Sequence, residues 1–218
     1  MNEKLKNILV DGAILCAAST VFALAANFAF SSLKADAAHD DPLVTAIIQG
    51  DAKQLAELVK PGAQATCKPD DHGRTALMRA AYAYIADEAK LAETDEKRAS
   101  MIAPLLDHGA ILDQKDDDGW TALMWASWSN LPKVTAALVE RSADVKSADT
   151  MGNTALGLAA ARGNPEVVRI LMGHGADPKA LTKAGQSVFD LVEEGRRTNT
   201  DKKLLKKYLH ILDLLNGK

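Results

Sequence analysis

Three tryptophans lie close together near the middle of the chain, at Trp120, Trp125 and Trp128. Tyr82 and Tyr84 form a second, smaller group of aromatic residues earlier in the sequence. Exposed Trp, Tyr and Arg side chains near the middle of a surface are typical of binding hot spots. The chemistry that these residues indicate is therefore recognition of a partner rather than bond making.

Residues suited to catalysis or metal binding are present, but their spacing does not favour either. No two of the five histidines have metal-ligand spacing. These histidines are His39, His72, His108, His174 and His210. The acidic run 116–118 lacks the alternating ligands and distal Glu of a calcium loop, so we expect a solvated turn there. The chain has no nucleophile-elbow, zinc-protease or phosphate-loop motif. We predict a protein that is not an enzyme and that uses no metal or cofactor.

The composition is that of a soluble globular chain with an acidic balance. Of the 218 residues, 47% are hydrophobic and 25% are charged, which argues against wholesale disorder. The formal net charge is -3, whereas a protein that binds nucleic acid by bulk electrostatics needs a basic surface. We therefore expect no nucleic-acid partner.

The body of the chain is built from a repeated segment. Residues 116–124 read DDDGWTALM, and residues 149–157 read DTMGNTALG, which places their glycines 33 positions apart. A further step of 33 leads to Gly185, and residues 70–78 (DDHGRTALM) repeat the same opening. The glycine in that first copy lies 46 positions before Gly119, which indicates a 13-residue insertion. A fixed period of this length indicates stacked structural units.

Each unit carries local signals for a turn followed by two helices. The glycines of the openings suit a backbone with positive φ in a tight turn. The threonine two positions later, as in Thr121 and Thr154, can cap the start of a short, Ala-rich helix. A second helix follows with apolar residues at helical spacing and ends near Gly109 or Gly175. One such unit cannot bury its apolar face alone, but a stack of them can.

This pattern resembles the ankyrin repeat over roughly Asp40 to Leu191. The resemblance implies an all-α fold, an ankyrin-repeat α-solenoid of helix-turn-helix units joined by β-hairpin-like turns. Two family positions differ in this chain. Alanine replaces the usual proline and Met or Gly replaces the usual histidine at these residues: Ala76, Ala122, Ala155, Met78, Met124 and Gly157.

The period divides the chain into repeats and a cap. The expected repeats are 40–68, 69–115 with an insertion at 85–100, 116–148, 149–180 and a partial repeat at 181–195. The insertion contains good helix formers and no Gly or Pro, so we expect helix there, as a solvated lever or as an arm that contacts a partner. Residues 196–218 are expected to form a capping helix, its helical part at about Asp201 to Leu215.

The stretch 196–207 is strongly basic. An interaction with nucleic acid or with an anionic membrane would be one reading of this charge. Leucines such as Leu205 and Leu212 lie among the charges at helical spacing. That pattern favours a capping helix with one face on the stack and the other in water.

The N-terminal 37 residues have the three parts of a secretory signal peptide. Lys4 and Lys6 precede the uncharged run 13–30, and Ala35-Asp36-Ala37 forms an A-x-A site. We expect cleavage after Ala37, and the alternative is an uncleaved membrane anchor. Cleavage removes Cys16 and leaves Cys67 as a lone thiol, either buried or reactive.

The resemblance also implies a set of partner-binding positions at the turn tips and on the exposed side of the first helices. Trp120 aligns with Arg74 and Asn153, so we expect its position to be exposed, whereas Trp125 is expected to be half buried. The implied positions are Asp71, His72, Arg74, Tyr82, Asp117, Asp118, Trp120, Trp128, Ser129, Thr150, Met151, Asn153 and Arg162.

The sequence therefore predicts a monomeric scaffold of the exported bacterial ankyrin-repeat type. It would bind a protein partner through the concave face of repeats two to four. Its expected location is the periplasm, where it could support or inhibit another protein. The alternative is an ankyrin scaffold that an uncleaved N-terminal helix tethers to the inner membrane, facing the periplasm.

Overall fold

The computed structural model describes residues 41–59, 70–83 and 88–217. The predicted export signal, Cys67 and Tyr84 lie outside the described residues. Within these ranges the regular structure is helical, apart from an isolated antiparallel bridge between Ala148 and Thr154.

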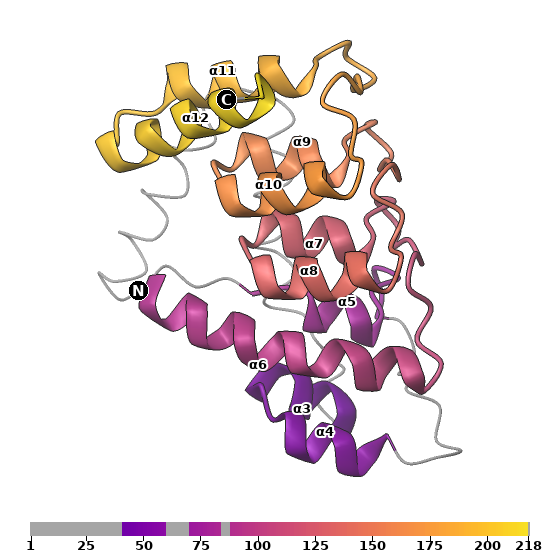
Figure 1. The fold of residues 1–218 in the computed structure, drawn as a ribbon. Coiled ribbons are helices and arrows are strands. Elements are labelled where there is room, and N and C mark those ends of the chain that lie inside the picture. Colours follow the sequence, from indigo (N-terminus) through magenta and orange to yellow (C-terminus); the bar gives the residue numbers. More distant parts are fainter. Residues whose placement is uncertain (1–40, 60–69, 84–87, 218) are drawn as a thin grey trace, which may run out of the picture.

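The helices come in pairs that stack along one direction (Figure 1). The first helices of the pairs are α3 (Pro42–Gln49), α5 (Ala76–Ala80), α7 (Ala122–Trp128), α9 (Ala155–Ala161) and α11 (Val188–Thr198). The second helices are α4 (Ala52–Leu58), α6 (Glu88–Asp107), α8 (Pro132–Glu140), α10 (Pro165–Gly173) and α12 (Lys202–Leu215). Each helix contacts the corresponding helix of the neighbouring pair. The predicted all-α solenoid is therefore confirmed.

The first helices begin at the predicted caps. The side-chain oxygens of Thr75, Thr121 and Thr154 accept a hydrogen bond from the backbone N–H three residues later, at 3.3, 3.4 and 3.2 Å. Ser187 makes the same contact at the start of α11, at 3.3 Å. These bonds satisfy amides that have no partner within the helix. The repeat opening therefore starts a helix by local chemistry alone.

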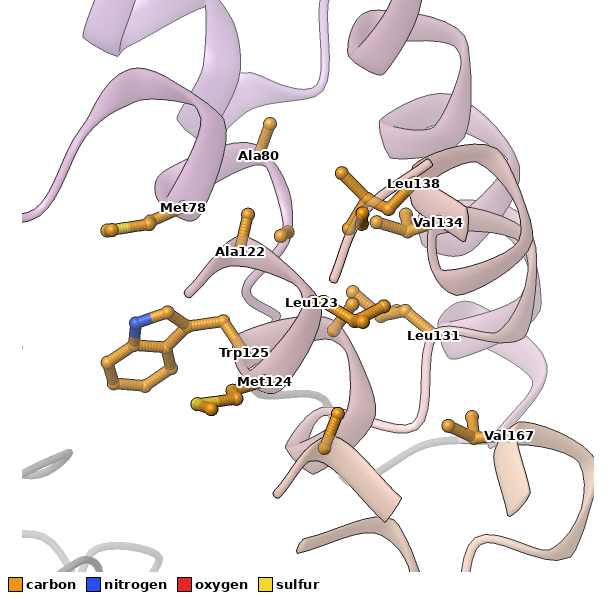
Figure 2. Close-up of a cluster of buried hydrophobic side chains, with 14 of the residues drawn as sticks. Met78, Ala80, Ala122, Leu123, Met124, Trp125, Leu131, Val134, Leu138 and Val167 are labelled. Carbon is orange, nitrogen blue, oxygen red and sulfur yellow. The ribbon is translucent and has the colours of Figure 1, made fainter. Parts of the chain in front are cut away.

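The two layers of helices enclose a core of mostly aliphatic side chains (Figure 2). Leu123 points from α7 toward Leu131 and Leu138, which belong to the second-helix side of the stack. Trp125 points from α7 to the opposite side, near Met124. The short helix α7 therefore has two functions, since one side holds the layers together and the other carries aromatic residues.

The carbonyl groups at the ends of three first helices accept hydrogen bonds from side chains of the second-helix layer. Arg98 Nη1 donates to the Arg79 oxygen at 2.7 Å, and Asn164 Nδ2 donates to the Ser127 oxygen at 2.9 Å. Tyr208 Oη donates to the Ala161 oxygen at 2.8 Å. Because a buried carbonyl without a partner is costly, these contacts stabilise helices too short to be stable alone.

A left-handed backbone recurs just after the second helices α6, α8 and α10. Gly109 and Gly175 have φ of 96° and 84°, and Ser142 occupies the same place in the intervening repeat with φ of 69°. Glycine adopts this conformation freely, whereas a residue with a Cβ is strained by roughly 1–2 kcal/mol. Ser142 is therefore a strained position in an otherwise regular array.

Replacing Ser142 by glycine is expected to raise the free energy of unfolding by about 0.5–1 kcal/mol, because relief of strain exceeds the added entropy of the unfolded chain. Urea unfolding followed by circular dichroism measures the change. Ser147→Gly is the matched control, since Ser147 is not among the non-glycine residues with positive φ. It should lower stability slightly, and an equal gain from both variants would contradict the interpretation.

The insertion of repeat two is helical from Glu88, where it forms the first part of the 20-residue helix α6. Asp95 on this helix is buried, and its carboxylate accepts hydrogen bonds from the N–H groups of Lys133 and Val134 at 2.9 and 3.0 Å. Those groups lie at the start of α8, whose own N-cap, Leu131, makes no side-chain bond. Burial raises the pKa of Asp95 above its usual value. The insertion thus supplies a cap to the next repeat and is packed rather than a solvated lever.

Asp95→Ala is expected to lower the free energy of unfolding by about 2–3 kcal/mol, because two buried N–H groups lose a charged acceptor. Thermal and urea unfolding measure the loss. Glu96→Ala is the control, since Glu96 forms a solvent-exposed ion pair with Lys133. It should change stability by less than about 0.5 kcal/mol. Similar losses in both variants would show that α6 contributes only by its charge.

The boundary predicted between 195 and 196 is wrong, because it falls inside α11, which continues to Thr198. Gly195 does not end a helix. It is the place where the ring of Tyr208 packs against α11, and a Cβ built at this glycine would lie 2.6 Å from Tyr208 Cζ. The terminal helix α12 then starts after the N-cap Asp201 and ends at Leu215, where the sequence places it.

Candidate protein-binding surface

The turn that opens each repeat is organised by its first aspartate. Asp116 Oδ1 accepts hydrogen bonds from the N–H groups of Asp118 and Trp120, at 3.1 and 2.8 Å. Asp149 makes the equivalent bonds to Met151 and Asn153, both at 2.8 Å. Asp70 repeats the geometry in the turn before them, with two bonds of 2.9 Å. Asp116 and Asp149 are buried, so the expectation of a fully solvated turn at 116–118 is wrong for Asp116.

The second oxygen of each of these aspartates binds a side chain that differs from repeat to repeat. Asp116 Oδ2 accepts from Trp125 Nε1 at 2.9 Å, and Asp149 Oδ2 accepts from Asn153 Nδ2 at 3.0 Å. Asp70 Oδ2 forms ion pairs with Arg74 and Arg79 at 2.9 Å. Burial raises the pKa of Asp116 in spite of its hydrogen bonds.

This arrangement corrects the predicted exposure of Trp120 and Asn153. Their exposed fractions are 8% and 5%, so both side chains are buried. The alignment suggested an exposed position for Trp120 because the residues aligned with it, Arg74 and Asn153, are both polar. Arg74 and Asn153 instead turn toward the aspartate of their own turn, while Trp120 packs on neighbouring rings. Trp125, expected to be half buried, is also buried, at 5%.

Successive turns are joined by backbone hydrogen bonds. The N–H of Asp117 donates to the His72 oxygen at 3.1 Å, and the N–H of Thr150 donates to the Asp118 oxygen at 3.0 Å. The N–H of Lys183 continues the series to the Met151 oxygen, at 2.9 Å. The turn tips therefore form a continuous ridge, and their spacing is set by the backbone.

A series of contacts between aromatic rings and one guanidinium connects three repeats. The Trp125 ring contacts Tyr82 edge-on at 5.2 Å and Trp120 at 4.6 Å, between ring centroids. Trp120 contacts Trp128 edge-on at 5.7 Å, and the Arg162 guanidinium lies 4.6 Å above the Trp128 ring. We call Tyr82, Trp120, Trp125, Trp128 and Arg162 the aromatic cluster. Edge-to-face and cation–π contacts of this kind hold each ring in a defined orientation.

The structure separates the thirteen predicted positions by exposure. The exposed residues are Asp71, Asp117, Thr150 and Met151. The partly exposed residues are His72, Arg74, Tyr82, Asp118, Trp128, Ser129 and Arg162. Trp120 and Asn153 are buried. The surface that a partner could touch therefore consists of the turn tips and the outer members of the aromatic cluster.

Two residues with a part in this surface were not among the predicted positions. Asp116 fixes the turn and the Trp125 ring, and Arg79 pairs with Asp70. The signal for Asp116 was its recurrence at the same place as Asp70 and Asp149. Arg79 aligns with Trp125, so position within the repeat could have identified it.

The turn tips carry an acidic charge. Asp117 and Asp118 are adjacent, and the pKa of Asp118 is raised by burial and then by the neighbouring charge of Asp117.

In the described ranges, no group of three His, Cys, Asp or Glu residues is arranged to hold a metal ion. None of the helices in that part of the chain has the length and apolar character needed to span a bilayer.

Paired helices that stack with their turns in register define a class of repeat scaffold. Residues 92–182 match the family model described as ankyrin repeats (3 copies). This segment, which holds α7 to α10, is therefore similar to ankyrin repeats. Ankyrin repeats are typically protein-interaction modules rather than enzymes, so the match indicates a protein-binding scaffold. The search of curated proteins found no match.

Proposed function

We propose that this protein is an exported scaffold that binds a protein partner through the concave face of repeats two to four. By concave face we mean the turn tips of these repeats together with the outward side of α5, α7 and α9. The observation that carries the proposal is the aromatic cluster, because its contacts run without a break from Tyr82 in repeat two to Arg162 in repeat four. A single partner segment that crosses three repeats would contact this cluster with the middle part of the segment.

The surface is suited to binding because it is held in place before a partner arrives. Trp120 and Trp125 are buried and serve as a base for the more exposed ring of Trp128. Asp116 fixes Trp125, and the backbone bonds between turns fix the ridge. A preformed surface loses little conformational entropy on binding. We expect direct contacts from Asp71, His72, Arg74, Tyr82, Asp117, Asp118, Trp128, Ser129, Thr150, Met151 and Arg162.

A crosslinked pull-down from the native cell envelope tests the face. The variant Trp128→Ala with Met151→Ala removes an aromatic and an apolar contact, and Met151 is 45% exposed. Recovery of the partner is expected to fall at least about tenfold, the effect of losing one hot-spot side chain. Ile111→Ala with Leu58→Ala is the control, since both residues are exposed and belong to or follow second helices. Undiminished recovery with the face variant, with its unfolding curve unchanged, would contradict the proposed face.

Location and assembly are proposed on the signal-like pattern of residues 1–37 and on the composition of the chain. We propose a monomer in the periplasm that supports or inhibits another periplasmic protein. Mass spectrometry of the native protein should show loss of 37 residues. An intact mass, with detergent needed for extraction, would favour the tethered alternative. Sedimentation equilibrium tests the monomer.

A further inference from the structure

The charges of the chain are separated along the stack. Residues 41–195 contain 16 basic and 23 acidic residues, whereas residues 196–218 contain seven basic and two acidic residues. The small net charge of -3 therefore results from an acidic array of repeats and a basic end whose charges largely cancel. The basic end coincides with the end of α11 and with α12, which close the stack at its yellow end in Figure 1.

The helix α12 has one buried side and carries its basic residues on the sides that face away from the stack. Tyr208, Ile211 and Leu215 are buried against the stack. Lys202 and Lys206 are exposed, and they lie four positions apart and therefore on one side of the helix. Arg197 is exposed at the end of α11, next to the start of α12. We call Arg197, Lys202 and Lys206 the basic patch.

The basic patch is not neutralised within the described residues. Its three side chains form no ion pair with any other residue that the structure describes, whereas the neighbouring Arg196 pairs with Glu193 at 2.8 Å. The one acidic residue of the stretch 196–207, Asp201, is the N-cap of α12, where it accepts hydrogen bonds from the N–H groups of Lys203 and Leu204. Three cationic groups therefore face outward from the closed end of the solenoid.

An apolar residue lies on the same side of α12. Leu209 is three positions after Lys206 and seven after Lys202, and 53% of its surface is exposed. On this side of the helix, Leu209 follows the two lysines and precedes the exposed Asp213. A leucine next to lysines suits a surface that offers negative charge with hydrocarbon beneath it, because the leucine can enter the headgroup region while the lysines reach phosphates. A nucleic acid or an acidic peptide would use the charges but leave Leu209 in water.

We propose that the basic patch and Leu209 dock this end of the solenoid on an anionic phospholipid surface. The interaction with the lipid surface is mostly electrostatic. It is therefore weak for a single molecule, reversible and sensitive to salt. It leaves the turn tips of repeats two to four uncovered, because the patch belongs to the terminal helix pair. The inference does not depend on the proposed partner-binding face.

Sedimentation with vesicles tests this docking on the full chain. Binding to vesicles of phosphatidylglycerol and phosphatidylcholine is compared with binding to phosphatidylcholine alone. The uncharged run 13–30 is common to all variants, so the ratio of the two affinities is the relevant quantity. The variant Arg197→Gln, Lys202→Gln, Lys206→Gln is expected to reduce that ratio by about 100-fold, or about fivefold for each basic residue.

The control variant removes the same charge from elsewhere. Lys146, Lys179 and Lys183 are exposed in the loops and turns of repeats three to five, and their replacement by glutamine should leave the ratio nearly unchanged. Leu209→Ala should weaken lipid binding several-fold without affecting binding to heparin. Equal losses from both triple variants, or no preference for anionic vesicles, would overturn the proposal. Tight RNA or heparin binding that depends on the basic patch, with vesicle binding insensitive to Leu209→Ala, would also overturn the proposal. The ligand of the basic patch would then be a nucleic acid and not a lipid.

Discussion

Replacing Asp116 by alanine is expected to lower the free energy of unfolding by about 3–4 kcal/mol, which is large for one residue. The change leaves three donors without their acceptor in a buried region: the N–H groups of Asp118 and Trp120 and the indole N–H of Trp125. The turn loses its fixed shape at the same time as the Trp125 ring loses its anchor. Stability and the order of the aromatic cluster should therefore decrease together.

Urea unfolding measures the stability of this variant, and near-ultraviolet circular dichroism reports the packing of the tryptophans. Asp117→Ala is the matched control, because Asp117 is the exposed neighbour in the same turn. It should change stability by no more than about 0.5 kcal/mol and leave the aromatic signal intact. A small effect of Asp116→Ala would mean that water replaces the carboxylate, and the proposed anchoring of Trp125 would then be wrong.

The features that the sequence predicted well are those determined by residues close together in the chain. Gly119 and Gly152 have the positive φ expected of them, at 82° each, and Thr121 and Thr154 cap their helices. His174 Nδ1 is within 2.8 Å of the Ile170 oxygen, as suits a residue at a helix end. Turn and cap chemistry acts over four residues or fewer, so it can be read without knowledge of the rest of the fold.

The features that were missed depend on contacts between residues distant in the sequence. Asp95 caps a helix whose first amides are 38 and 39 positions away, and no pattern within either segment indicates that pair. Trp120 was expected to be exposed because polar residues occupy the equivalent places in other repeats. Its burial follows from the rings of Trp125 and Trp128 around it, which are contacts that polarity at one position does not encode.

The arrangement separates the task of holding the stack together from the task of recognition. Leu123 and Leu138 in the core hold the two layers of helices together, and the hydrogen bond from Asn164 to the Ser127 carbonyl joins neighbouring repeats. The exposed side chains of the turn tips and the outer rings can then vary without loss of the fold, because the stack depends on the core, the buried aspartates and the backbone bonds between turns. This separation is the physical reason why a repeat stack can present different surfaces on one fold.

The second large effect is expected at Gly152, where the backbones of two turns approach each other. A Cβ built at this position would lie 2.7 Å from the Lys183 nitrogen, and φ is 82°. Gly185 occupies the same place in the last turn, with φ of 77° and no atom within 4 Å of its Cβ position. The two glycines share the strained conformation, but only Gly152 has a neighbouring turn against it. Comparing their alanine variants therefore separates backbone strain from contact between repeats.

Gly185→Ala should lower the free energy of unfolding by about 1–2 kcal/mol, the cost of a left-handed residue with a Cβ. Gly152→Ala should lower it by about 2 kcal/mol more, because the added methyl group pushes the next turn away and weakens the bond between the Lys183 N–H and the Met151 oxygen. In a solenoid a weakened junction separates the units on its two sides. Hydrogen exchange in α11 and α12 should accordingly become much faster in Gly152→Ala than in α7 and α8 of the same variant. Equal losses of stability from the two glycine variants, with uniform exchange along the chain, would show that the turns are aligned by the helices alone and that the ridge of backbone bonds contributes nothing to the stack.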